Sequence, residues 1–238
     1  MKFERVIVFV AALAATLATA RLGVWQLDRA AGKQALQQAI DERFAQPPLP
    51  AEALALKAET AALQWHRQVR VRGVWMPQGT VFLENRQHAG RPGFVVVTPL
   101  QLPDGTAVAV QRGWLPRDFV DRTRVAAPLL PEGEVEVVAR IAPPPARLME
   151  FDGAGSGPIR QNLELDAYSG EVQRTLRPLS LLQLEGAEPN SDGMVREWPR
   201  PSSGVQKHHG YAFQWFALSA LLAGLYVWFQ LIRPRRRA

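Results

Sequence analysis

The chain has 238 residues, enough for one modest soluble domain plus membrane segments and too few for a large multidomain enzyme. Its formal net charge of +6 lies at the two ends, since the charges of residues 22–210 balance, so the domain lacks the clustered basic face that nucleic-acid binding requires. The absence of cysteine excludes disulfides, thiolate nucleophiles, iron–sulfur clusters and Cys-based copper or zinc sites.

The first expected element is an N-terminal apolar helix, residues 1–27, built on an uncharged run from Val6 to Ala20. One interpretation is a retained transmembrane anchor, because a helix that extends to Leu27 is long enough to cross a bilayer. The other is a cleaved signal peptide, because Ala18-Thr19-Ala20 matches the A-x-A cleavage pattern. We favour the anchor, and both interpretations export the middle of the chain.

Residues 28–206 are expected to form an exported α+β domain dominated by antiparallel sheet. Apolar residues at helical spacing predict a helix from Asp28 to Gln46, ended by prolines, and a weaker helix from Glu52 to Leu63. Alternating and apolar runs predict strands at 69–75, 81–84, 94–102, 107–115, 135–141, 159–165 and 179–184.

Turn residues separate these strands. Gly90-Arg91-Pro92-Gly93 predicts one turn, and Pro103-Asp104-Gly105 predicts a hairpin between two long apolar runs. Asp166 is expected to cap a short helix, and a linker rich in proline and glycine runs from Ala187 to Val205. The arginines that alternate along the first strand are interpreted as a solvated face.

The domain contains no catalytic constellation, and we predict that the protein is not an enzyme. Its histidines, His66 and His88, are not spaced as a metal-binding pair, and there is no G-x-S-x-G nucleophile elbow. The glycines of residues 153–158 lack the Lys-Ser/Thr ending of a phosphate-binding loop, and Pro158 removes a backbone donor. We interpret this stretch as a flexible loop.

The C-terminal element is a second membrane span at residues 207–232, followed by a basic tail at 233–238. The run from Tyr211 to Ile232 is uncharged, and as a helix it covers about 33 Å. The arginines of the tail place the C-terminus in the cytoplasm by the positive-inside rule. The expected topology is a multi-pass protein of the cell (inner) membrane, with both termini cytoplasmic and the central domain periplasmic.

Two adjacent histidines lie at the outer end of this span. On a helix, His208 shares one face with Tyr211, Ala212, Trp215 and Ser219, whereas His209 points roughly 100° away. One interpretation is that the histidines and aromatics are ordinary interfacial residues. The functional alternative is that His208 is a metal or haem ligand at the membrane surface, with Tyr211 and Trp215 beside the cofactor.

Several short motifs recur in an order that is typical of one protein family. They are Leu22-Gly23-Val24-Trp25-Gln26 with Arg29 and Lys33, Arg67 to Gly73, Val97-Thr98-Pro99-Leu100, Asp104-Gly105, Arg112-Gly113-Trp114-Leu115-Pro116, and His208-x-x-Tyr211-Ala212-x-x-Trp215. In this order, between two spans, the chain resembles the Surfeit locus family of cytochrome c oxidase assembly factors, called Surf-one in animals and bacteria and Shy-one in yeast. His209 stands where that family usually has an apolar residue.

The resemblance implies two transmembrane helices around an exported α+β domain and a role in maturing haem-copper oxidases. It implies that the protein holds haem a for insertion into cytochrome c oxidase subunit I, with His208 as the iron ligand. The implied partners are subunit I, haem a synthase and the membrane. The alternative is a membrane-anchored scaffold that docks oxidase subunits without any cofactor.

Overall fold

A computed structural model of the chain describes residues 2–118, 120, 125, 130–149, 157–184, 192–199 and 204–233. Most of the glycine-rich stretch at 153–158 and of the basic tail lies outside these residues. The chain divides into two compact units. The helical unit comprises Met1–Ala39 and Pro199–Ala238, and the sheet domain comprises Ile40–Trp198.

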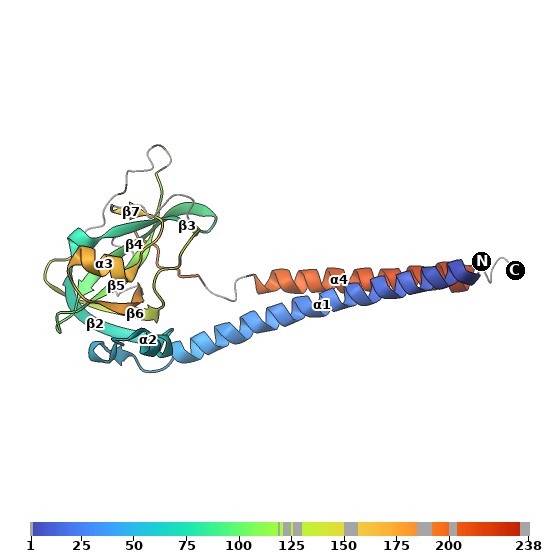
Figure 1. The fold of residues 1–238 in the computed structure, drawn as a ribbon, viewed down its shortest axis with the longest axis horizontal. Helices are drawn as coiled ribbons and strands as arrows, with labels where there is room; N and C mark the ends of the chain where they lie inside the picture. Colours follow the sequence, from blue (N-terminus) through green and yellow to red (C-terminus); the bar gives the residue numbers. More distant parts are fainter. Residues whose placement is uncertain are drawn as a thin grey trace. The chain divides into compact units, whose positions relative to one another are not determined.

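The helical unit is an antiparallel pair of long helices (Figure 1). Helix α1 runs from Lys2 to Phe44, and α4 runs from Val205 to Tyr226 with a π-helical continuation, η3, at Val227–Ile232. Both are long and apolar enough to cross a membrane. Helix α1 continues without a break past residue 27, so its helical structure does not show where the membrane anchor ends. The expected limits of the anchor (1–27) and of the C-terminal span (207–232) therefore stay predictions.

The two helices meet along a stripe, rich in small residues, that we call the helix seam. It comprises Ala12, Thr16, Thr19, Gly23, Gln26 and Ala30 of α1 and Val205, His208, Ala212, Trp215, Ser219 and Leu222 of α4, all buried or half-buried. Their spacing alternates between three and four residues, the period of left-handed coiled-coil packing. The Ser219 hydroxyl donates a hydrogen bond to the Thr16 carbonyl at 2.9 Å, and the rings of Phe9 and Tyr226 lie 5.7 Å apart. These contacts fix the antiparallel register.

The sheet domain is an eight-stranded sheet that closes on itself (Figure 1). Its strands are β1 (Leu49–Pro50), β2 (Gln68–Trp75), β3 (Val81–His88), β4 (Arg91–Gln101), β5 (Ala107–Pro116), β6 (Glu134–Ala142), β7 (Ile159–Arg160) and β8 (Leu176–Gln183). Their order is β1-β2-β6-β8-β5-β4-β3-β7, and β2 also pairs with β4. Strands β2, β6, β8, β5 and β4 therefore form a small barrel, with β1, β3 and β7 outside the ring.

Antiparallel pairs dominate the sheet, as expected, but the sheet is mixed and not purely antiparallel. The β4–β5 hairpin is antiparallel, as the turn at Asp104-Gly105 predicts, but β8 runs parallel to β5, β1 to β2, and β7 to β3. Hairpin turns join only antiparallel neighbours, whereas β8 reaches β5 through a long crossover that includes β6 and α3 (Leu165–Val172). Turn residues in the sequence therefore predict the hairpin connections but not the crossover that makes β8 parallel to β5.

Local boundaries differ from expectation in three places. The strand expected at 159–165 has only two paired residues, Ile159 and Arg160, and α3 begins at Leu165 with Glu164 at the N-cap. Asp166 therefore lies in the first turn of the helix and is not its cap. The weak helix after Pro50 is split into η1 (Ala51–Ala53) and α2 (Ala58–Gln64), and β4 already begins at Arg91 inside the expected turn.

The barrel interior is filled by branched apolar side chains from the ring strands. Its buried members include Val69, Val71, Val108, Val110, Val137, Ile141, Leu179 and Leu181. The ring closes where Val74 faces Gln101 and Trp75 faces Leu100. At Gly73 an added Cβ would lie 2.2 Å from the Gln101 carbonyl oxygen, so this closure needs glycine.

A buried arginine of β8 holds the turn between β4 and β5 in place. The guanidinium of Arg177 donates hydrogen bonds to the Leu54 carbonyl at 2.6 Å, to the Thr106 hydroxyl at 3.1 Å and to the Asp104 carboxylate. The Arg177 side chain is only 3% exposed. Hydrogen bonding from Thr106, with Arg177 nearby, lowers the pKa of Asp104. This network positions the turn and leaves no guanidinium edge for a ligand.

Candidate functional site

His208 lies in the first turn of α4 and faces α1 across the helix seam. Its Nδ1 is 2.8 Å from Oε1 of Gln26, a residue 182 positions earlier in the chain. The ring is half-buried, and among the described residues no hydrogen bond is made by its Nε2. His208 is thus an imidazole with Nδ1 engaged and with no hydrogen bond to Nε2 from any described residue, at the end of the helix pair where α4 begins.

The other residues expected on the His208 face separate in the structure. Ala212 is 2% exposed, Ser219 is 8% exposed, and Trp215 is half-buried, so all three lie on the helix seam. Tyr211 is 52% exposed and lies beside the seam. Three residues advance a helix by about 300° and four by about 400°, so Tyr211 and Ala212 lie on opposite sides of His208, and it is Ala212 that faces α1. His209 is exposed, as helical phase predicts.

Gln26 is the residue that sequence reasoning missed. It belongs to the Leu22–Gln26 motif, but no spacing rule pairs a glutamine with a histidine on a distant helix. Gly23, one turn earlier, allows the approach: a Cβ there would lie 2.8 Å from the ring of Phe216. Close helix packing of this kind is favoured by small residues in membrane helix pairs. The combination of Gly23 and Gln26 at seam spacing was the only available sequence signal.

The helical unit offers one candidate metal ligand, the His208 imidazole, which would suit a metal whose other ligands come from a cofactor. Within the part of the chain that the structure describes, no group of three or more His, Asp or Glu side chains could enclose a metal ion. A zinc or copper site formed by several protein ligands is therefore not formed by those residues. A porphyrin supplies four ligands to its iron and asks the protein for one or two, and a single imidazole with a free nitrogen is sufficient.

In the sheet domain, the Arg112–Pro116 motif holds the segment around Met194 against β5. Arg112 lies at a bulge in β5, and its guanidinium stacks 5.2 Å from the ring centroid of Trp75 and lies 3.4 Å from the Asp192 carboxylate. Burial lowers its pKa to about 10. An added Cβ on Gly113 would lie 2.7 Å from the Met194 side chain. Packing therefore accounts for Gly113, and Arg112 is held by Trp75 and Asp192.

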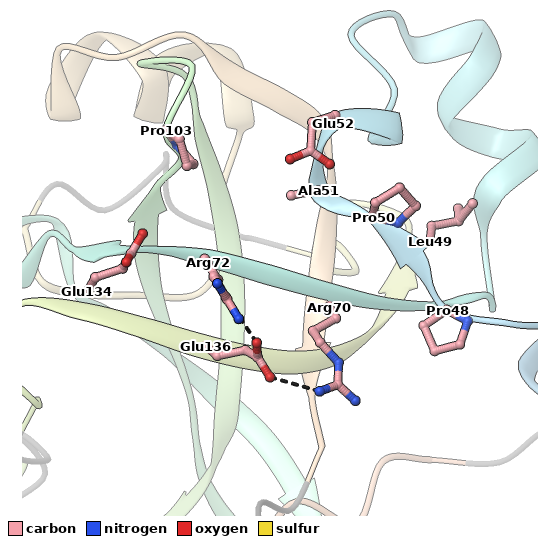
Figure 2. Close-up of a pocket in the computed structure, with 10 residues that line it drawn as sticks. All are labelled: Pro48, Leu49, Pro50, Ala51, Glu52, Arg70, Arg72, Pro103, Glu134 and Glu136. Atoms are coloured by element: carbon pink, nitrogen blue, oxygen red, sulfur yellow. Dashed lines mark hydrogen bonds and ion pairs between the residues drawn. The ribbon is translucent and has the colours of Figure 1, made fainter.

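A groove of about 490 Å³ lies on the outer surface of the sheet domain, lined by the proline-rich β1 segment and by polar residues of β2 and β6 (Figure 2). The Glu136 carboxylate accepts hydrogen bonds from Arg70 at 2.9 Å and from Arg72 at 3.1 Å. The bond from Arg72 is the main reason that the pKa of Glu136 is lowered. Both arginines are well exposed. These charges pair with one another, which confirms the interpretation of a solvated strand face.

Comparison with known proteins covers most of the chain. A sequence profile of the SURF1 family matches residues 13–220. A SURF1-like protein of Rickettsia felis is 24% identical over 87% of this chain and 89% of its own length. An uncharacterised SURF1-like protein of Mycobacterium bovis is 29% identical over 91% of this chain and 80% of its own length. The positions of Gln26 and His208 lie within the matched range.

Proposed function

The chain belongs to the SURF1 family, known in general as oxidase assembly factors, and from that premise we propose that it holds haem a for insertion into cytochrome c oxidase subunit I. In this proposal His208 would hold the haem iron through its imidazole. The protein works as a membrane-anchored holder and not as an enzyme, and it receives haem a from haem a synthase.

The observation that carries the proposal is the position of His208 between two apolar helices. Its ring is half-buried on the helix seam and no described residue bonds to its Nε2, whereas the chemically equal His209 is exposed. Haem has an apolar body and charged propionates, so it suits a site at the boundary between the bilayer and the water. A ligand at this boundary needs an apolar surface on the bilayer side, and the helices supply it with partly exposed side chains such as Phe216.

The aromatic residues near His208 have separate roles in this proposal. Trp215 lies on the helix seam two turns from His208, on the bilayer side of the imidazole, and provides apolar surface there. Tyr211 is exposed beside the seam, where an amphipathic ring meets either the edge of a bound macrocycle or the lipid interface. When bound, the haem iron would be held by His208, and the neighbouring side chains would exclude water or orient that ring.

The decisive experiment compares His208→Ala with His209→Ala in cells that make haem a. Each full-length variant is co-expressed with a haem a synthase, purified in detergent and analysed for pigment. We expect His208→Ala to lower the co-purified haem by at least about tenfold, because loss of a direct ligand costs no less than loss of its supporting partner. His209→Ala should retain it, and both variants should stay inserted and abundant because neither ring is in a packed core.

The alternative is a cofactor-free scaffold whose exported domain docks oxidase subunits. Wild-type protein without haem absorbance, together with normal oxidase haem content in the His208→Ala strain, would favour the scaffold. Equal losses in both histidine variants would instead indicate that both rings act as ligands. Loss in His209→Ala alone would refute the assignment of His208.

A further inference from the structure

The amide of Gln26 faces the imidazole of His208 across the helix seam, and the two atoms in contact decide where the proton of the ring lies. The amide oxygen Oε1 carries no hydrogen and acts only as an acceptor. His208 Nδ1 lies 2.8 Å from it, an ordinary distance for a donated N–H···O bond. The contact therefore requires a hydrogen on Nδ1, which leaves the lone pair of the neutral ring on Nε2.

We propose that Gln26 is a positioning residue that fixes His208 in the Nδ1–H tautomer and turns its Nε2 lone pair outward to take a haem iron. The inference rests on the haem-holding function proposed above. Residues that bind metals through one imidazole nitrogen commonly donate the other N–H to an oxygen acceptor, which fixes the orientation of the ring and raises the basicity of the ligand. In this chain the acceptor comes from the other helix, so the ligand is competent only when the helices are paired.

The surrounding seam holds the two side chains in register. Gly23 lies one turn from Gln26 and leaves room for the ring of Phe216, whose closest atoms would lie 2.8 Å from a Cβ at that position. Two turns further along the seam from Ala212, the Ser219 hydroxyl is bonded to the Thr16 carbonyl. These contacts limit sliding and rotation of α4, so the amide oxygen stays opposite Nδ1.

The tautomer of His208 can be measured without haem. The full-length protein is labelled with ¹⁵N-histidine, purified haem-free in detergent micelles, and examined by two-bond ¹H–¹⁵N correlation at a pH where the ring is neutral. His208→Ala identifies the signals among the four histidines of the chain. We expect the Nδ1–H pattern in the wild type and the Nε2–H pattern, or a mixture, in Gln26→Leu. An Nε2–H pattern in the wild type, or the same pattern in both proteins, would overturn the inference.

The second measurement is haem a binding by the same proteins. Gln26→Leu should raise the apparent Kd for haem a by about 10- to 100-fold, the usual effect of removing the partner of a ligating histidine. Gln26→Glu keeps an oxygen acceptor and should retain binding, with a lower reduction potential because a carboxylate makes the imidazole a stronger donor. The matched control is Gln34→Leu, which removes an exposed glutamine from the same helix and should change neither measurement.

The two measurements separate the two proposals. Haem binding by the wild type with an unchanged tautomer in Gln26→Leu would refute the role of Gln26 and leave the haem-holding function standing. The expected tautomer change in a protein that binds no haem a would refute the haem-holding function. A loss of haem in Gln26→Leu that Gln26→Glu shares would indicate disturbed helix packing and would also overturn the inference.

Discussion

The closure of the barrel offers a sharp test of the sheet domain. Gly73 lies where β2 meets β4, and the Cβ of an alanine there would be 2.2 Å from the Gln101 carbonyl oxygen, against 3.4 Å or more for an ordinary contact. The obstructing atom belongs to the backbone, so rotation of a side chain cannot relieve the overlap. Gly73→Ala must push β2 and β4 apart at the two residue pairs that close the ring.

The expected cost follows from two contributions. Overpacking of a closely fitted site costs about 1–3 kcal/mol, and each backbone hydrogen bond weakened by the separation adds about 1 kcal/mol. The free energy of unfolding should therefore fall by about 2–5 kcal/mol, which corresponds to a decrease in Tm of about 5–15 °C for a protein of this size. Trp75 is buried at the closure, so tryptophan fluorescence of the full-length protein in detergent should report the transition.

The matched control is Gly170→Ala in the same domain. Gly170 lies in α3, and an added Cβ there meets no atom within 4 Å. Alanine is a better helix former than glycine, so this variant should be unchanged or more stable by about 0.5–1 kcal/mol. If Gly73→Ala unfolded at the same temperature as Gly170→Ala, β2 and β4 would not be in contact as described, and the barrel would be an open sheet.

Three further predictions concern the remaining structure. Burial, with nearby arginine charge, lowers the pKa of His66, so the unfolded state takes up a proton first and the free energy of unfolding should fall as the pH drops below about 6.5. Asparagine tolerates the local φ of 72°, so His66→Asn should fold and should show a weaker pH dependence of the urea midpoint. Arg177→Met should lower the free energy of unfolding by about 2–4 kcal/mol in urea titrations, because it removes three hydrogen bonds and strands a carbonyl, whereas the exposed Arg174→Met should change it little. A phosphatase fused after Ala238 should be inactive and one inserted near Gly155 active, and the reverse pattern would contradict the proposed topology.

Much of the fold follows from local patterns in the sequence. The apolar runs at both ends predict two long helices, and the proline cluster predicts the end of the first, which the structure places at Phe44. The ring strands were found because alternation and branched side chains are local properties. The mixed direction of the sheet was not found, because the partner of a strand such as β8 depends on a crossover through residues that carry no pairing signal.

The candidate site shows the same division. Helical phase alone separates His208 from His209, since a rotation of about 100° per residue turns one toward the helix seam and the other away. The same rule places Tyr211 near His208, but it says only which residues are neighbours on one helix and not where the partner helix lies. In the structure Tyr211 is 52% exposed and lies beside the seam.

What the sequence determined by itself is therefore periodic and local: two helices, the strand set, the hairpin at Asp104-Gly105 and the phase of His208. Only the tertiary structure decided which residues 100 or more positions apart come into contact, such as Arg177 with Leu54 and His208 with Gln26. The physical reason is that hydrogen bonds between distant segments depend on the packing of whole elements. The sequence contains many glutamines and carbonyls that could be the partner in such a bond, and only the packing determines which of them is close enough.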